Sequence, residues 1–100
     1  MQIRVTEANN FAEGEIRVFE IDGTKVSVVA SRGHLFAFDD TCTHRGCSLA
    51  EGELDGSTVT CPCHGSQFDV TSGAVIRGPA REAVRSRSVK ADGPDLLVES

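Results

Sequence analysis

Apolar residues along the chain occur in short runs, and turn signals separate these runs about every ten residues. The runs IRVFEI (16–21) and TKVSVVA (24–30) flank Asp22-Gly23, which is a strong signal for a two-residue hairpin. The run HLFAF (34–38) follows Ser31-Arg32-Gly33, which we expect to form a three-residue hairpin loop. Further turn signals stand at 55–56, 71–73 and 91–95. This rhythm of β-branched runs and turns is typical of an all-β sandwich or a small barrel.

Helical periodicity is poor throughout the sequence. The best helix candidate is a single turn after Thr6, around EANNF (7–11). No repeat, low-complexity tract or linker interrupts the 100 residues, so we expect one domain over 1–100. The chemically interesting residues therefore lie in loops on a β scaffold.

Charge is unevenly distributed along a chain whose formal net charge is −5. Residues 1–69 carry eleven acids and five bases, whereas residues 70–90 carry five bases and one acid. An acidic balance argues against nucleic acid as the main partner, because neutralising phosphates needs a concentrated basic face. No window approaches eighteen apolar residues and no export signal is visible, so we expect no membrane segment and a cytoplasmic location.

All four cysteines and two of the three histidines fall into two short clusters. The clusters are Cys42-x-His44-x2-Cys47 and Cys61-x-Cys63-His64, with sixteen residues between His44 and Cys61. In a reducing compartment, cysteines grouped in this way indicate metal ligands or redox groups before structural disulfides. The third histidine, His34, shares strand parity with Phe36 and is interpreted as a structural or surface residue.

Two kinds of metal site could use these residues. A structural zinc site needs four nitrogen or sulfur ligands, so six candidates would leave two idle beside the ion. A [2Fe-2S] cluster with mixed ligation fits better, because one iron takes two thiolates and the other takes two imidazoles. The first loop then offers Cys42 and His44. The second loop offers Cys61 and His64.

That ligand assignment leaves Cys47 and Cys63, one from each loop. A disulfide between them would tie the loops together, and closing about 17 residues is worth roughly 3 kcal/mol in the chain-entropy model. A reducing cytoplasm argues against such a bridge, but a buried and preset bridge can resist reduction, so we expect it to form. Gly46 and Gly65 follow the two histidines and would let backbone N–H groups approach the cluster sulfurs.

The two boxes resemble those of the Rieske iron–sulfur family. CTHRGCSL (42–49) and CPCHGSQFDVTSG (61–73) match the family patterns C-T-H-x-G-C and C-P-C-H-G-S, and Gly78-Pro79-Ala80 resembles the family's proline loop. The resemblance implies an all-β, Rieske-type antiparallel β-sandwich. It also implies one [2Fe-2S] cluster, held in a small cluster-binding β subdomain over about 40–80 and covered by Gly78 and Pro79.

One departure from the respiratory members of that family concerns the second box. Those proteins usually continue C-P-C-H-G-S-x-Y, and the serine and tyrosine hydroxyls donate to cluster sulfurs. Here Ser66 is present, but Phe68 stands at the tyrosine position and is expected to pack inward with Val70. Because each donor stabilises the reduced cluster, the sequence predicts a potential intermediate within the family range of about −150 to +300 mV.

The predicted function is one-electron transfer by a soluble, monomeric ferredoxin, from a flavoprotein reductase to a terminal oxygenase or other acceptor. No nucleophile–base pair, phosphate loop or carboxylate dyad occurs, so we expect no substrate chemistry in this chain. Arg45 and Leu49 are expected to lie where the partner docks. Arg85 and Arg87 are expected on a solvated strand face, and Asp39 and Asp40 in a turn. Alternatives are a small subunit of a larger, nitrite-reductase-like oxidoreductase and a zinc-stabilised interaction module.

Overall fold

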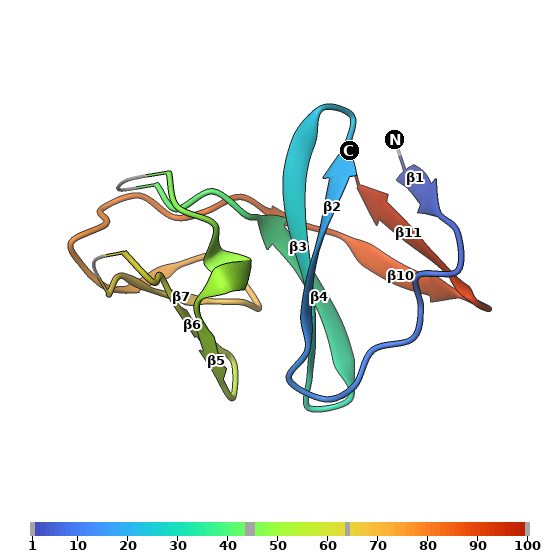
Figure 1. Ribbon diagram of the computed structural model, residues 1–100, viewed down its shortest axis with the longest axis horizontal. Helices are drawn as coiled ribbons and strands as arrows, with labels where there is room; N and C mark the ends of the chain where they lie inside the picture. The colour runs from blue at the N-terminus through green and yellow to red at the C-terminus, as the bar shows by residue number, and fades with distance from the viewer. Residues whose placement is uncertain (1, 44–45, 64, 100) are drawn as a thin grey trace.

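Three antiparallel sheets make up the protein, as a computed structural model that describes residues 2–43, 46–63 and 65–99 shows (Figure 1). The all-β expectation is confirmed. One sheet has the order β1-β11-β10, the second β2-β3-β4-β9 and the third β5-β6-β7-β8. The elements are β1 (Gln2–Val5), β2 (Ile16–Ile21), β3 (Thr24–Ser31), β4 (His34–Asp39), the 3-10 helix η1 (Leu49–Glu51), β5 (Glu53–Asp55), β6 (Thr58–Thr60), β7 (Gln67–Asp69), β8 (Val75–Arg77), β9 (Ser86–Arg87), β10 (Val89–Asp92) and β11 (Asp95–Glu99).

The β2–β3 hairpin forms as predicted. Asp22 and Gly23 both have positive φ, 51° and 82°, as a two-residue turn between twisted strands requires. The next hairpin loop is shorter than the predicted three residues. Ser31 remains in the ladder opposite His34, so Arg32 and Gly33 alone make the turn, with φ of 54° and 78°.

The helical turn expected at 7–11 is wrong. In that segment the backbone N–H groups serve tertiary partners, because Glu7 donates to a carboxylate oxygen of Asp95 and Asn9 donates to the carbonyl of Pro94. The segment therefore runs along the β10–β11 turn in an irregular conformation. Local sequence preference is too weak here to compete with these partners.

The sheet β2-β3-β4-β9 lies in the middle, with β1, β10 and β11 on one side and β5–β8 on the other (Figure 1). Alternate residues of β3 face opposite sides, so Val28 packs into one core and Val29 into the other. The core toward β11 contains Ala8, Ile21, Val26, Val28, Ala37, Leu96 and Val98. The core toward β5–β8 contains Val29, Phe38, Cys42, Leu49, Val59, Cys61, Phe68, Val70, Ala80 and Val84.

Arg87 departs from the sequence prediction because it is buried, with 8% of its surface exposed. Its Nε donates to Oδ1 of Asp39 at 2.5 Å and its Nη1 donates to the carbonyl of Glu99 at 3.1 Å. The guanidinium thus joins β4, β9 and β11, and Asp39 is a strand residue with a structural partner. Arg85 is exposed, as expected, and so is His34. Within the described ranges, no helix has the length and apolar character needed to cross a bilayer.

A group of surface charges fastens β1 to the β10–β11 turn. Arg4 forms ion pairs with Asp92 at 2.8 Å and with Asp95 at 2.9 Å. The N–H of Glu7 and the Arg4 guanidinium, in that order of effect, lower the pKa of Asp95 below its ordinary value. A lowered folded-state pKa means that this carboxylate stabilises the fold above its unfolded-state pKa. The contribution is lost as pH falls through the folded-state pKa.

The variant Asp95→Asn is therefore expected to show a flatter decline of stability on acidification below about pH 4 than the parent chain. Urea midpoints measured across that range would check this. Glu53→Gln is the matched control, because Glu53 is an exposed strand carboxylate on another sheet. An equal flattening in both variants would contradict the assignment to Asp95.

Candidate metal centre

The first cysteine box forms a closed loop over residues 42–47. The N–H of Cys42 donates to the carbonyl of Cys47 at 2.8 Å, and the N–H of Gly46 donates to the carbonyl of Cys42 at 2.9 Å. Gly46 has a φ of 76°, which a residue with a side chain adopts only with strain. A bridge between Thr41 and Ser48 closes the base of the loop.

The second box, residues 61–66, repeats this pattern of hydrogen bonds. The N–H of Cys61 donates to the carbonyl of Ser66 at 2.7 Å, and the N–H of Gly65 donates to the carbonyl of Cys61 at 3.2 Å. Gly65 has a φ of 79°. Each loop therefore starts with a cysteine, has a left-handed glycine at its fifth position and closes at its sixth. The described residues of the two boxes therefore share one hydrogen-bonding pattern, and the two boxes follow strands of different sheets.

The first cysteine of each loop is buried. Cys42 and Cys61 are both 2% exposed, and both belong to the core cluster that includes Phe68. Neither takes part in the disulfide. Cys61 follows β6 directly, so the β5–β6 hairpin fixes its position, while Cys42 follows β4 after Asp40 and Thr41. Two thiols from separate loops are thus held away from bulk water.

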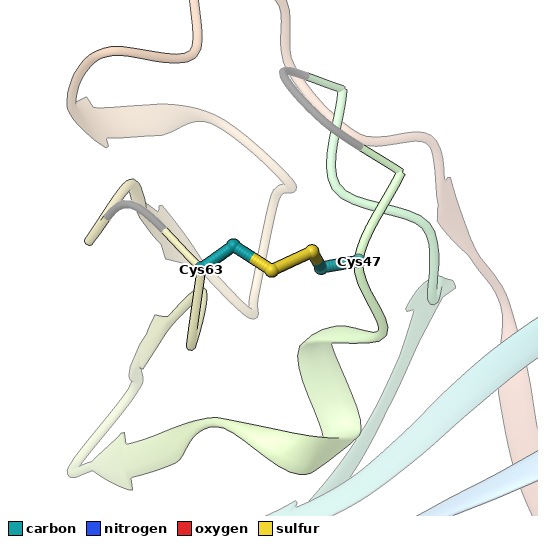
Figure 2. Close-up of a disulfide and its surroundings, with 2 residues drawn as sticks. All are labelled: Cys47 and Cys63. Atoms are coloured by element: carbon teal, nitrogen blue, oxygen red, sulfur yellow. A yellow bond between two sulfur atoms is a disulfide. The ribbon is translucent and has the colours of Figure 1, made fainter.

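The expected disulfide between Cys47 and Cys63 is present (Figure 2). It joins the sixth residue of the first loop to the third residue of the second, with 6.5 Å between the two Cα atoms. The Sγ atoms of Cys47, Cys61 and Cys63 all lie within 4.8 Å of one another. The bridge therefore runs close beside a buried cysteine of the second loop.

Asp40 anchors the first loop to the middle sheet. It is 2% exposed, and its Oδ1 accepts hydrogen bonds from the Ser27 hydroxyl at 2.6 Å and from the N–H of Ala50 at 2.9 Å. Its carbonyl accepts from the N–H of Leu49 at 2.9 Å. Asp40 lies in a bend that follows β4, in agreement with the expected turn, and it is also a buried acceptor that holds η1 against β3.

The segment that resembles a proline loop is attached to both boxes. The N–H of Ala80 donates to Oγ of the fully buried Ser66 at 3.0 Å, and Oγ1 of Thr43 donates to the carbonyl of Glu82 at 2.7 Å. The peptide between Gly78 and Pro79 is cis. Since Ser66 uses an oxygen lone pair toward Ala80, its hydroxyl proton is left to donate elsewhere. Sequence reasoning missed Thr43, because its partner lies 39 residues away.

At two further glycines, Gly52 and Gly73, another backbone segment lies too close to leave room for a side chain. Sequence reasoning missed the role of both. A Cβ at Gly52 would lie 1.8 Å from the carbonyl oxygen of Thr60, just before the second box. A Cβ at Gly73 would lie 2.0 Å from the carbonyl oxygen of Val84, just after the proline segment. Glu51 and Ser72 precede these glycines, and nothing in the local sequence reveals which distant backbone comes close.

The structure contradicts one of the predictions made for site residues, confirms another and leaves others outside the described residues. Leu49 as a docking residue is wrong, because η1 turns its side chain into the core and leaves it 0% exposed. Phe68 is fully buried in the same core cluster as Val70, as expected. Gly78 and Pro79 are exposed on the segment beside the boxes. The predictions for His44, Arg45 and His64 fall outside the described residues.

The described residues fit a [2Fe-2S] cluster. Two buried cysteines stand at equivalent positions of matched loops, and each loop has a left-handed glycine without a side chain at its fifth position. This arrangement suits a group that needs two thiolates and a shielded environment. An all-β scaffold with paired cysteine loops, a disulfide between them and a third segment bonded to both is the architecture of a class of iron–sulfur electron-transfer proteins.

The chain belongs to the Rieske [2Fe-2S] domain family, whose sequence model matches residues 1–88. It is 33% identical over 96 residues to the ferredoxin component of biphenyl 2,3-dioxygenase from Rhodococcus jostii, covering 96% of this chain and 90% of that protein. It is 37% identical over 93 residues to the ferredoxin component of the p-cumate 2,3-dioxygenase system of Pseudomonas putida, covering 91% and 79%. Both relatives are named as ferredoxin components of dioxygenases.

Solved structures agree with these sequence matches. The ferredoxin of carbazole 1,9a-dioxygenase from Nocardioides aromaticivorans superposes with a TM-score of 0.89 at 31% identity, covering 97% of this chain and 95% of that one. A complex of reduced oxygenase and oxidized ferredoxin in carbazole 1,9a-dioxygenase contains a chain that matches equally well, with a TM-score of 0.89. The expected Rieske-type fold is thereby confirmed.

Proposed function

We propose that this protein is the ferredoxin component of an oxygenase system, which carries single electrons from a flavoprotein reductase to a terminal oxygenase. The observation that supports this most directly is the pair of matched loops, each starting with a buried cysteine. The likeness to ferredoxin components over nearly the whole of both chains supports the same role. A cytoplasmic location and a monomeric state are parts of this proposal.

One [2Fe-2S] cluster would be held by Cys42, Cys61, His44 and His64. When bound, the cluster supplies the site that takes up and gives away one electron. The chain contributes the rest. Burial of Cys42 and Cys61 excludes water from the thiolate side, and the proline segment, fixed through Thr43 and Ser66, covers the loops.

Ser66 is proposed to tune the reduction potential through its hydroxyl proton. Replacing it by alanine is expected to lower the potential, because a donor to the more negative reduced state is lost. The change should also cost about 1–3 kcal/mol of stability, because the buried N–H of Ala80 loses its acceptor. Protein-film voltammetry and urea unfolding would measure the two effects.

The matched control for that experiment is Ser72→Ala. Ser72 also accepts a backbone N–H, from Ala74 at 3.2 Å, but it is exposed and lies in the β7–β8 turn. Its replacement should leave the potential unchanged. A potential that moves equally in both variants, or in neither, would refute the role given to Ser66.

Phe68 stands where respiratory members of the family have a tyrosine, so this core lacks the tyrosine hydroxyl. Phe68→Tyr is expected to raise the potential, because Phe68 stands in the second box at the position where respiratory members of the family place a tyrosine that donates to a cluster sulfur. Phe38→Tyr is the control, since Phe38 is equally buried in the same apolar core but comes from β4. A potential that does not rise in Phe68→Tyr would contradict the proposal.

Partner docking is proposed at the end of the molecule that carries the two boxes. A groove of about 370 Å³, lined by Thr43, Pro79, Arg81 and Glu82, lies between the first box and the proline segment. Arg45 is proposed to belong to this face. Redox encounters are typically small, below about 1,200 Å² of buried surface, so docking at this end alone would be sufficient.

Metal analysis and electron-transfer assays together test the proposed function. The purified chain should be reddish-brown and contain two irons and two labile sulfides. It should be reduced by a reductase recovered from the native host by affinity capture and be oxidised again by the recovered oxygenase. A colourless protein containing zinc would refute the proposal. Stable co-purification with a large catalytic subunit would favour the alternative of an oxidoreductase subunit.

A further inference from the structure

Three sulfur atoms of the second box and its bridge form a compact group beside the buried core. The Sγ atoms of Cys47, Cys61 and Cys63 lie within 4.8 Å of one another. Cys61 is buried, Cys47 is half-buried and Cys63 is exposed, so the group extends from the core to the solvent. Cys42 is not part of this group.

We propose that Cys47, Cys61 and Cys63 form a three-thiolate site for a soft metal ion of the Zn²⁺ and Cu⁺ class once the disulfide is reduced. In the oxidised chain the bridge occupies two of the three sulfurs and closes the site. The disulfide thus keeps Cys61 from binding such ions. The three thiolates can bind a soft ion whether or not Cys61 is also a ligand of an iron–sulfur cluster. Competition between that ion and a cluster for Cys61 rests on the proposed function.

Opening the site is a two-electron reduction. A cellular dithiol of the thioredoxin type gives two electrons and two protons to the bond between Cys47 and Cys63 and becomes a disulfide itself. The chain gains two thiols. Binding of the ion then releases the thiol protons, because the thiolate is the form that binds metal.

The distances among the sulfurs suit a soft ion after a small adjustment. A Zn–S bond of about 2.3 Å in tetrahedral geometry places two sulfur ligands roughly 3.8 Å apart. Cys61 already lies within 4.8 Å of both bridge sulfurs. An ordinary disulfide bond is about 2.05 Å long, so the sulfurs of Cys47 and Cys63 would have to separate by somewhat less than 2 Å after reduction. Side-chain rotation alone is enough for such a movement.

The backbone around these sulfurs is held by bonds that reduction does not touch. Within each loop, the N–H of Cys42 donates to Cys47 and the N–H of Cys61 donates to Ser66. The contact between Gly52 and the carbonyl of Thr60 fixes the strand that leads into the second loop. The segment that contains Ala80 and Glu82 is bonded to both loops, so the three thiols should remain together after the bridge opens. Thiolate ligands select Zn²⁺ and Cu⁺ over harder ions.

Titration of the full-length, metal-free chain with Co²⁺, a spectroscopic substitute for Zn²⁺, tests the site. After reduction with a phosphine, the chain should bind one Co²⁺ with a thiolate-to-metal charge-transfer band. The disulfide form should bind at least about a hundredfold more weakly, since it lacks two ligands. Circular dichroism recorded in both states would show whether the strands persist. Equal affinity in the two states would overturn the proposal.

Single serine variants identify the ligands. In the reduced chain, replacing Cys47, Cys61 or Cys63 should weaken Co²⁺ binding at least about tenfold, whereas Cys42→Ser should leave it unchanged. If Co²⁺ binding weakens equally in all four variants, the ion binds an unfolded chain. If binding weakens in Cys42→Ser but not in Cys47→Ser, the ion binds the proposed cluster ligands. Either result would overturn the site. If the purified protein holds no iron but the reduced chain shows the predicted pattern, only the proposed function fails.

Discussion

Replacing Cys47 and Cys63 together by serine is expected to lower the thermal midpoint of unfolding by about 12–24 °C. The disulfide closes a loop of about 17 residues, and the chain-entropy model assigns roughly 3 kcal/mol to its removal. For a domain of this size, each kcal/mol corresponds to about 4–8 °C. Far-UV circular dichroism would follow the strands, and visible absorbance would follow the bound cluster in the same heating experiment.

A phosphine reductant provides the internal control for the double variant. It should lower the midpoint of the parent chain to that of Cys47→Ser/Cys63→Ser, and it should have no effect on the variant. A variant that unfolds within a few degrees of the oxidised parent would contradict this prediction. The proline segment, bonded to Thr43 of the first loop and to Ser66 of the second, would then be sufficient to hold the loops together.

Replacing Gly52 by alanine is expected to cost about 3 kcal/mol or more and to impair retention of the cluster. The added Cβ would lie 1.8 Å from the carbonyl oxygen of Thr60 and 3.2 Å from Cδ of Pro62. Because the first of these atoms is backbone, the β6 strand and the second box would have to move. The urea midpoint and the iron content per chain would measure the two consequences.

Gly33→Ala separates this steric effect from the general cost of losing a glycine. Gly33 has a φ of 78° and no atom within 4 Å of an added Cβ, so its replacement should cost only about 1–2 kcal/mol of backbone strain. At Gly52 φ is −89°, which alanine adopts readily, so the whole effect there is steric. Equal losses in the two variants would contradict the close approach.

Sequence alone was sufficient for the parts of the fold that depend on local patterns. The Asp22-Gly23 hairpin and the inward packing of Phe68 follow from turn chemistry and strand alternation, and both are confirmed. The disulfide between Cys47 and Cys63 could be predicted because the ligand assignment left one cysteine in each loop. The ligand roles of the histidines stay predictions.

What sequence could not predict depends on contacts between distant segments. Leu49 ends the first box, so it was expected on the surface, but Asp40 holds η1 so that the leucine points into the core. Arg87 was placed on a solvated face because its burial depends on Asp39 and on the last strand. Such partners become apparent only when the sheets are assembled.

The double burial of β3 has a consequence for how the molecule comes apart. Val28 belongs to one apolar core and Val29 to the other, so the same strand forms a wall of both. If either core opened alone, one face of this strand would be hydrated while its other face remained packed. The end that carries the two boxes therefore cannot melt as an independent unit, and loss of the bound cofactor on heating should coincide with loss of the strands near both termini.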